Sequence, residues 1–186
     1  MKNLRKWLLN YLVLFAISGS ILALDQWTKY LVRTKLDLGE AWVPFPDVLP
    51  FLRIVHWKNT GAAFGIFPQA SSIFTIVAIL VSIAIIYYWS KIPSKQNALR
   101  LALALQLAGA LGNLISRLTL GIVVDFIAVG NFPVFNVADS SISIGVTILV
   151  IATWLDERAR SKSSSNIETD ARGDCEERAP EVDPMG

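Results

Sequence analysis

The chain has 186 residues, of which 53% are hydrophobic, and a mean hydropathy of +0.49. This length suits one domain, and this composition favours a membrane protein over a soluble one. The net charge of +2 conceals a division, because residues 156–186 contain nine acidic and five basic residues while residues 1–155 carry a net +6. Lysines and arginines beside membrane spans account for this basic excess more simply than nucleic-acid binding, which we do not expect.

The counts of cysteine and histidine limit the possible metal sites. Cys175 is the single cysteine and His56 the single histidine. An intramolecular disulfide, a thiolate metal cluster and a histidine-rich metal site are therefore excluded. The composition leaves open a calcium or magnesium ion held by carboxylates, although few acidic residues lie near the outer ends of the apolar segments.

The first apolar segment runs from about residue 8 to 24 and follows three basic residues. This pattern is also that of a cleaved signal peptide. We favour a first transmembrane helix, because further apolar segments follow and the nearby Asp25 and Lys29 look integrated with them.

The outer segment, about residues 30–70, separates the first apolar segment from the second. It contains Pro44, Pro46 and Pro50, then the β-forming "FLRIVHW" and the glycine-containing "NTGAAFG". Prolines interrupt regular structure, whereas β-branched and aromatic residues favour strands. We expect a small β-like patch that rests on the outer membrane surface.

Three further apolar segments complete the predicted membrane domain. The segment at 71–89 has no charge, and as a helix it measures roughly 28 Å, enough to cross the hydrocarbon core. The others lie at about 98–117 and 136–154. We therefore expect an all-α membrane protein with a four-helix domain at 1–155, followed by a disordered cytoplasmic tail at 156–186 because the tail lacks aromatic residues and has few apolar ones.

The distribution of basic residues predicts the orientation. Nine lysines and arginines lie at the N-terminus, in the loop at 90–100 and just after the last span, which fall on one side of a four-span protein. Six lie on the opposite side. The richer side is expected to be cytoplasmic, so both termini are predicted to face the cytoplasm.

A polar stripe crosses the third apolar segment. Gly109, Asn113 and Arg117 are spaced four residues apart, with Gly112 and Ser116 beside them. On a helix, this spacing places them on one face, which should point into the protein rather than into lipid. A glycine–asparagine stripe taken alone is more typical of helix–helix packing than of a functional site.

Asp125 and Asp139 are the only acidic residues between Val48 and Leu155. Asp139 follows Asn136 by three residues, so both lie on one face of the helix that they begin, with Asp139 roughly 5 Å below the outer surface. Thirteen turn-rich residues separate the two aspartates, so their side chains can meet at the outer membrane edge. Asn136 is also a good helix N-cap.

Two neighbouring carboxyl groups have a specific chemical use. Because both do not ionise easily together, one retains a proton, and the pair can act as acid and base in hydrolysis. The alternative is a structural ion pair of Asp125 and Asp139 with Arg117. Spacing alone favours neither a catalytic nor a structural role for the two aspartates.

Two smaller polar groups remain. Asp25 and Lys29 form an i, i+4 pair in the favoured order, for which a structural role is the better interpretation. Asn59 and Gly61 indicate a tight turn, and Asn59 could equally direct its amide at a substrate. Spacing does not decide between these roles.

These features together resemble the lipoprotein signal peptidases, the type II signal peptidases of bacteria. Five motifs occur in order along residues 20–150: "DQWTK" (25–29), "NTGAAFG" (59–65), "GALGNLISR" (109–117), "VVDF" (123–126) and "FNVADS" (135–140). Each motif is weak alone, whereas five in sequence on a four-span chain are specific.

The resemblance implies four helices, an outer cradle with a short helical element, and an aspartic endopeptidase of the inner membrane with its active site near the outer face. It implies substrates that are prolipoproteins carrying diacylglycerol on the lipobox cysteine, cut before that cysteine, and no metal or organic cofactor. We expect the chain to contact membrane lipid and to act as a monomer. The implied catalytic pair is Asp125 and Asp139. The implied orienting residues are Asn59, Asn113, Arg117 and Asn136, and the implied structural positions are Asp25, Lys29, Gly61, Gly109 and Gly112.

One position departs from the family pattern, which usually has an acidic residue before the arginine where this chain has Ser116. Two rival classes also fit some of the residues. A proton- or ion-coupled transporter would use the same aspartates, but such sites usually lie near the bilayer midplane. A non-catalytic membrane scaffold would need no such convergence of polar groups.

Overall fold

The computed structural model describes residues 2–61 and 71–177. In these ranges the chain forms four helices and a three-stranded sheet. All four helices are long and apolar enough to cross a membrane. The elements in chain order are α1 (Lys2–Lys35), β1 (Ala41–Trp42), β2 (Leu52–Asn59), α2 (Ser71–Trp89), α3 (Asn97–Leu120), β3 (Val123–Val129) and α4 (Val137–Glu177).

The four predicted spans correspond to α1 to α4, and the main difference lies in α1. The apolar run at 8–24 is only its middle, because the helix continues through Asp25 and Lys29 to Lys35. These two side chains form an ion pair 2.8 Å long and are almost fully buried. Their charges therefore do not end the helix. The outer segment begins after Lys35 rather than near residue 30.

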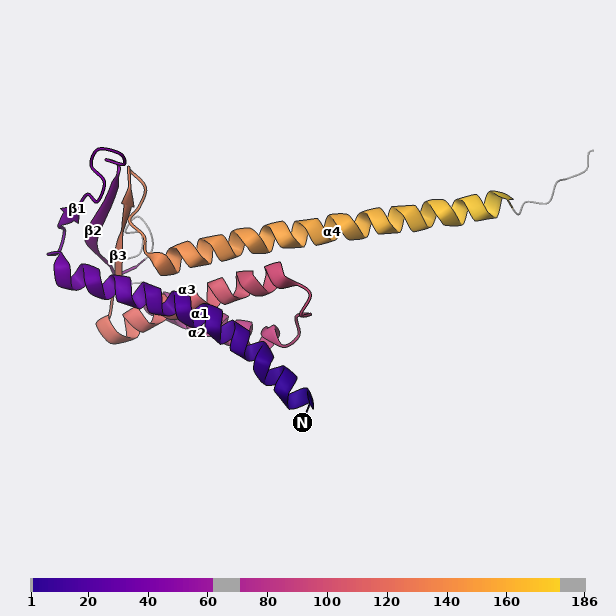
Figure 1. Ribbon diagram of the computed structural model, residues 1–186, viewed down its shortest axis with the longest axis horizontal. Coiled ribbons are helices and arrows are strands. Elements are labelled where there is room, and N and C mark those ends of the chain that lie inside the picture. Colours follow the sequence, from indigo (N-terminus) through magenta and orange to yellow (C-terminus); the bar gives the residue numbers. More distant parts are fainter. Residues whose placement is uncertain (1, 62–70, 178–186) are drawn as a thin grey trace, which may run out of the picture. The chain divides into compact units, whose positions relative to one another are not determined.

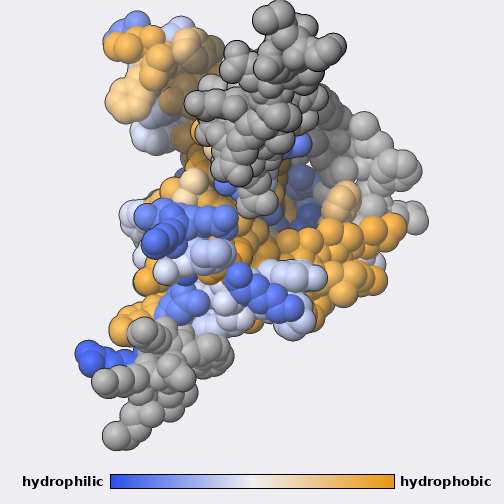
Figure 2. Space-filling view, turned by 90° about the vertical axis from the view of Figure 1, so that its right-hand side faces the viewer, coloured by the Kyte–Doolittle hydropathy of each residue, from blue (hydrophilic) through white to orange (hydrophobic). Residues whose placement is uncertain are grey.

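Helix α3 is the central helix of the membrane domain. It packs against α1 and against α2, and 56% of its most apolar window is buried, compared with 11–17% in the other three helices. Apolar side chains on those helices are exposed, as expected where lipid replaces protein as the neighbour. Figure 2 shows such apolar residues as patches that lie beside hydrophilic ones.

The sheet has the strand order β1–β2–β3, and both pairings are antiparallel. In Figure 1 the three strands gather near the end of α1 and the start of α4. The register places Trp57 opposite Asp125 and Asn59 opposite Val123, with an irregularity between Ile54 and Trp57. The predicted β-like patch is thus a sheet that combines the outer segment with a strand from the connection between α3 and α4.

A small apolar core fastens the sheet to the helices. Val32 from α1 packs with Val124 and Phe126 from β3, and all three are buried. The chain enters β3 through Gly121, which ends α3 in the left-handed region (φ 72°) and donates its N–H to the Arg117 carbonyl. Glycine is the residue best suited to this conformation. The turn brings β3 back across the end of the bundle at which α3 ends.

The chain forms two compact units that divide after Leu149, and the polar residues around Asp125 and Asp139 lie in the first. Helix α4 runs through both units to Glu177, whereas the composition predicts disorder from residue 156. A helix that already exists extends without a new nucleus, and alanine, glutamate, lysine and arginine in this segment are strong helix formers. Residues 36–61 and 121–136 contain strands and turns but not the short helical element that the resemblance implies.

Candidate active site

Asp125 lies in the middle of β3 and is only 2% exposed. Its Oδ2 accepts a hydrogen bond of 2.8 Å from Asn59 Nδ2, and its Oδ1 accepts one of 2.7 Å from Asn136 Nδ2. On β2, Asn59 lies two residues beyond Trp57, which is the residue opposite Asp125. Because alternate side chains of a strand share one face of the sheet, Asn59 and Asp125 lie on the same face and are diagonal neighbours. Both oxygens of the buried carboxyl group are therefore matched by amide donors.

Asp139 lies in the first turn of α4, as its spacing from Asn136 predicts. The Asp139 N–H donates to Asn136 Oδ1 at 2.9 Å, and the Asn136 N–H donates to Asp139 Oδ2 at 3.2 Å. This reciprocal arrangement is a capping box with aspartate in the third position. Asn136 therefore caps the helix and, with its amide group, also binds Asp125.

Asn113 on α3 connects the two aspartates to the membrane core. Its Nδ2 donates to Asp139 Oδ1 at 2.7 Å, while its Oδ1 accepts from Asn136 Nδ2 at 3.3 Å and from Lys29 Nζ at 3.0 Å. Asn113 is 8% exposed and Asn136 is fully buried. Residues from β2, β3, α1, α3 and α4 thus form one hydrogen-bonded network around Asp125 and Asp139.

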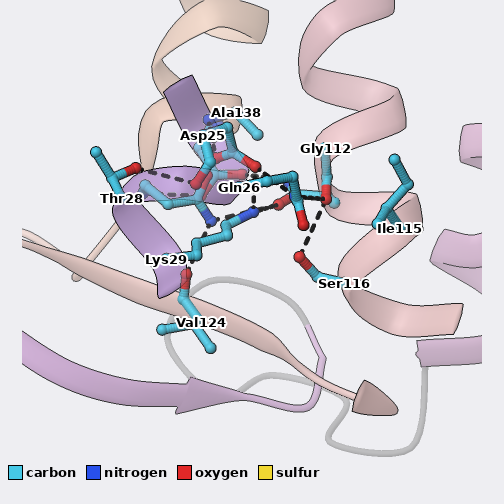
Figure 3. A network of polar contacts seen from close by, with 12 residues as sticks. Asp25, Gln26, Thr28, Lys29, Gly112, Ile115, Ser116, Val124 and Ala138 are labelled. Carbon is cyan, nitrogen blue, oxygen red and sulfur yellow. Dashed lines mark hydrogen bonds and ion pairs between the residues drawn. The ribbon is translucent and has the colours of Figure 1, made fainter. Parts of the chain in front are cut away.

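Asp25 and Lys29 lie on the α1 side of this network (Figure 3). Asp25 Oδ1 accepts the Ala138 N–H at the start of α4 at 2.9 Å, and Asp25 Oδ2 accepts from Gln26 Nε2 at 2.9 Å. Gln26 Nε2 also donates to the Gly112 carbonyl oxygen at 2.9 Å. The pair that the sequence assigns to structure therefore ties α1 to both α3 and α4.

Two glycines of α3 allow close approach at the site, and a third takes part in a turn. A Cβ atom at Gly109 would lie 2.4 Å from the Ala138 carbonyl oxygen, and one at Gly112 would lie 2.7 Å from Asp25 Oδ2. Gly61 is buried, and its N–H donates to Asn59 Oδ1 at 2.9 Å. The glycine stripe of α3 thus faces α1 and α4, and the remainder of the "NTGAAFG" motif, residues 62–65, lies outside the described residues.

Both aspartates open onto a pocket of about 830 Å³. Asn59, Asn113 and Arg117 line its polar end together with Asp125 and Asp139. The remaining wall is mainly apolar and comes from α2, α3, α4 and the connection before α4. Its apolar lining includes Phe74, Val77, Ala78, Val81, Ala110, Phe132, Pro133, Val134, Phe135, Ile142 and Ile144.

Arg117 lies in the pocket wall on α3. Its guanidinium lies 5.5 Å from the Phe74 ring centroid and interacts with the charges of Asp139 and Asp125 from the pocket wall. The preceding Ser116 is 1% exposed and donates its hydroxyl to the Gly112 carbonyl oxygen at 3.0 Å. Ser116, which stands where the family pattern has an acidic residue, therefore has a hydrogen-bond partner within α3. It places no charge beside Arg117.

The environment of Asp125 changes its acidity. Burial, followed by the charge of Asp139, raises the pKa of Asp125 to about 6, against the opposing effects of the Asn59 and Asn136 hydrogen bonds and of Lys29. Desolvation disfavours the ionised carboxylate, whereas amide donors favour it. A carboxyl group with a pKa near 6 can exchange a proton with substrate close to neutral pH.

Sequence patterns did not reveal every residue of the site. Gln26, and the pocket residues Phe74 and Val77 of α2, were missed, because apolar residues facing a pocket and those facing lipid have the same composition. Gln26 carried a weak signal as a polar neighbour of Asp25 in an apolar helix. Within residues 2–61 and 71–177, no three His, Cys, Asp or Glu side chains form a group that could hold a metal ion.

Comparisons with known proteins identify the family to which the chain belongs. The profile of the family described as Signal peptidase (SPase) II matches residues 17–155. The chain is 42% identical over 171 residues to a lipoprotein signal peptidase of Acinetobacter baumannii, covering 88% of this chain and 95% of that protein. It is 39% identical over 155 residues to one of Enterococcus faecalis, covering 82% and 94% of the two chains.

The fold also matches a solved structure. A structure titled "Bacterial membrane enzyme structure by the in meso method at 2.3 A resolution" superimposes with a TM-score of 0.72 and 38% sequence identity, covering 78% of this chain and 89% of that one. These matches extend over most of the membrane domain. The chain is therefore a multi-pass membrane protein, and it belongs to the signal peptidase II family of aspartic peptidases.

Proposed function

We propose that the chain removes the signal peptide from diacylglyceryl-modified prolipoproteins, cutting the bond before the lipidated cysteine, with Asp125 and Asp139 as the catalytic pair. The observation that carries the proposal is the convergence of both carboxyl groups, fully supplied with amide donors, at the polar end of an apolar pocket. Family membership supports the reaction class and the prolipoprotein substrates.

In the proposed reaction the pair shares one proton. The ionised carboxylate accepts a proton from water while the protonated carboxyl group donates a hydrogen bond to the scissile carbonyl oxygen. Water oxygen then attacks the carbonyl carbon to form a tetrahedral intermediate. Collapse breaks the C–N bond, and the proton taken from water is transferred to the leaving amine of the cysteine. Asn59, Asn113 and Asn136 hold the carboxyl groups for these transfers.

The pocket suits a substrate that is partly in lipid. Its polar end has the two aspartates and Arg117, and its remaining wall has apolar side chains from three helices that are long enough to span a membrane. A signal peptide and its attached acyl chains could lie along this wall, with the cleavage point at the aspartates. Because Asp139 is in the first turn of α4, we place this point near the outer membrane face.

The proposal is tested by supplying purified chain in lipid with a prolipoprotein that carries diacylglycerol on its lipobox cysteine. The matched control is the same prolipoprotein without the diacylglyceryl group. We expect one cut, before the lipidated cysteine, and at least about 10-fold slower cleavage of the unmodified control, since remote binding energy of the substrate contributes to catalysis. Absence of cleavage, or proton flux without cleavage, would overturn the proposal.

The pKa of Asp125 predicts a pH dependence. If the pair needs its shared proton, activity is present below about pH 6 and is lost as the pH rises through that value, so kcat/KM should fall about 10-fold per pH unit above it. In Asn59→Ala, loss of a donor that favours the ionised carboxylate should move this limb to higher pH. A pH–rate profile checks both results. A limb that moves to lower pH in Asn59→Ala contradicts this assignment.

The proposed orientation places both termini in the cytoplasm and the sheet outside it. A reporter enzyme active only outside the cytoplasm should be active when fused after Asp47, between β1 and β2, and inactive when fused after Pro93, between α2 and α3. The two fusions control for each other's expression, which is compared by immunoblotting. Activity in the reverse order would invert the topology.

A further inference from the structure

The three asparagines around the aspartates share one geometric property. Each directs its NH₂ group at a carboxyl oxygen, at distances of 2.7 or 2.8 Å. The two ends of an asparagine amide are nearly isosteric, so a half-turn would replace this donor with an acceptor. An acceptor facing an ionised carboxylate would repel it. Some other group must therefore hold each amide in its productive orientation.

For two of the asparagines that group is the backbone. Asn59 Oδ1 accepts the Gly61 N–H at 2.9 Å, and Asn136 Oδ1 accepts the Asp139 N–H at 2.9 Å. A half-turn of either amide would bring an NH₂ group against a backbone N–H. These two orientations are therefore determined by the local chain path, in the turn after β2 and in the cap of α4.

Asn113 differs, because its strongest orienting contact is a side chain from another helix. Asn113 Oδ1 accepts from Lys29 Nζ at 3.0 Å, and the Asn136 amide adds a longer contact of 3.3 Å. The lysine ammonium group only donates hydrogen bonds. A half-turn of the Asn113 amide would point its NH₂ group at the Lys29 ammonium group, so that two donors would face each other. It would also leave Asp139 facing the Asn113 amide oxygen.

Lys29 is itself held in position. It is 3% exposed and pairs with Asp25 Oδ2 at 2.8 Å, and Asp25 is fixed by the Ala138 N–H and the Gln26 amide. Figure 3 shows Lys29 reaching from α1 toward α3 within this group. The ion pair of Asp25 and Lys29 is therefore neutral overall and held by its neighbours. The Lys29 ammonium group also donates a hydrogen bond to Asn113.

We propose that Lys29 is a positioning residue for the reaction: it holds the Asn113 amide so that its NH₂ group donates to Asp139. This inference rests on the proposed function and adds a catalytic consequence to a pair otherwise assigned to structure. It predicts that loss of the lysine donor lowers kcat, because Asp139 loses its orientation, and leaves KM unchanged because the pocket wall is intact.

The test is a double-mutant cycle on the full chain in lipid, with the lipidated prolipoprotein as substrate. Lys29→Met is combined with Asp25→Asn, so that no unpaired charge is left buried. We expect this pair of changes and Asn113→Ala each to lower kcat about 10- to 100-fold, with KM within about twofold of wild type. When all three changes are combined, kcat should be within about twofold of Asn113→Ala alone, because the same contact is lost only once.

Ser18→Ala is the matched control. Ser18 is a buried polar residue of α1, as Lys29 is, but its hydroxyl donates to the Leu14 carbonyl oxygen of the same helix at 2.8 Å. We expect kcat of this variant to stay within about twofold of wild type, and its effect to be independent of Asn113→Ala.

The outcomes separate the inference from the proposed function. Wild-type kcat in the charge-neutral variant, or losses that multiply with Asn113→Ala, would overturn the positioning role while wild-type cleavage stands. If the charge-neutral variant does not fold, Lys29→Leu combined with Asp25→Asn takes its place, because leucine likewise donates no hydrogen bond to Asn113. Unchanged kcat in that variant also overturns the inference. Failure of wild type to cleave, or cleavage by Asp139→Asn, would instead overturn the proposed function.

Discussion

Replacing Asp139 or Asp125 with asparagine is expected to reduce prolipoprotein cleavage by about 10³-fold or more, since each change removes an acid–base group and the pair acts as a unit. Asparagine keeps the shape of the side chain but neither accepts a proton from water nor donates a carboxyl proton. Among the described residues that line the pocket, Asp125 and Asp139 are the only acids, so no third carboxyl group is available there to take the place of either. The measurement is kcat/KM with the lipidated substrate.

The control for this result is Asp47→Asn, the same chemical change at an exposed acidic residue of the outer segment. We expect it to leave kcat/KM within about twofold of wild type, as is usual for surface changes away from a site. Thermal unfolding in lipid should show that both variants of the pair remain folded. A folded Asp125 or Asp139 variant that retains about a tenth of wild-type activity would contradict an acid–base role.

The second large effect is expected from Gly109→Ala. A Cβ atom there would lie 2.4 Å from the Ala138 carbonyl oxygen, 2.5 Å from Ile142 Cγ1 and 2.7 Å from Ser141 Oγ. Backbone and packed side chains do not yield to such contacts, so α4 must move away from α3. Overpacking of this kind costs about 1–3 kcal/mol, and sometimes more. The displaced turn carries Asp139, so activity should fall by about 100-fold.

Gly19→Ala is the matched control, because Gly19 lies within α1 and a Cβ atom there would meet nothing within 4 Å. Alanine is the better helix former by up to about 1 kcal/mol, so this variant should be at least as stable as wild type. Thermal unfolding and cleavage are measured on both variants. Equal stability and activity of the two would show that α3 and α4 do not approach at Gly109 as closely as described.

Several contacts of the site join residues that are far apart in the sequence, so they are determined by the tertiary structure. Asn59 meets Asp125 because β2 and β3 pair in one register, 66 residues apart in sequence, and that register includes an irregularity that no local pattern predicts. The contact of Lys29 with Asn113 spans 84 residues. The interpretation of Asp25 and Lys29 as an i, i+4 pair identified their mutual contact but not its connection to Asp139.

The sequence by itself determined the four spans, the acidic first turn of α4 and the small-residue face of α3. These features depend on hydrophobicity, helical period and capping, which act over one to five turns of chain. The tertiary structure alone decided that α1 continues past its buried charges, that α2 supplies a pocket wall, and that three amides converge on two carboxyl groups. The physical reason is that buried charges and amides are stabilised only by partners, and those partners lie on other elements of the chain.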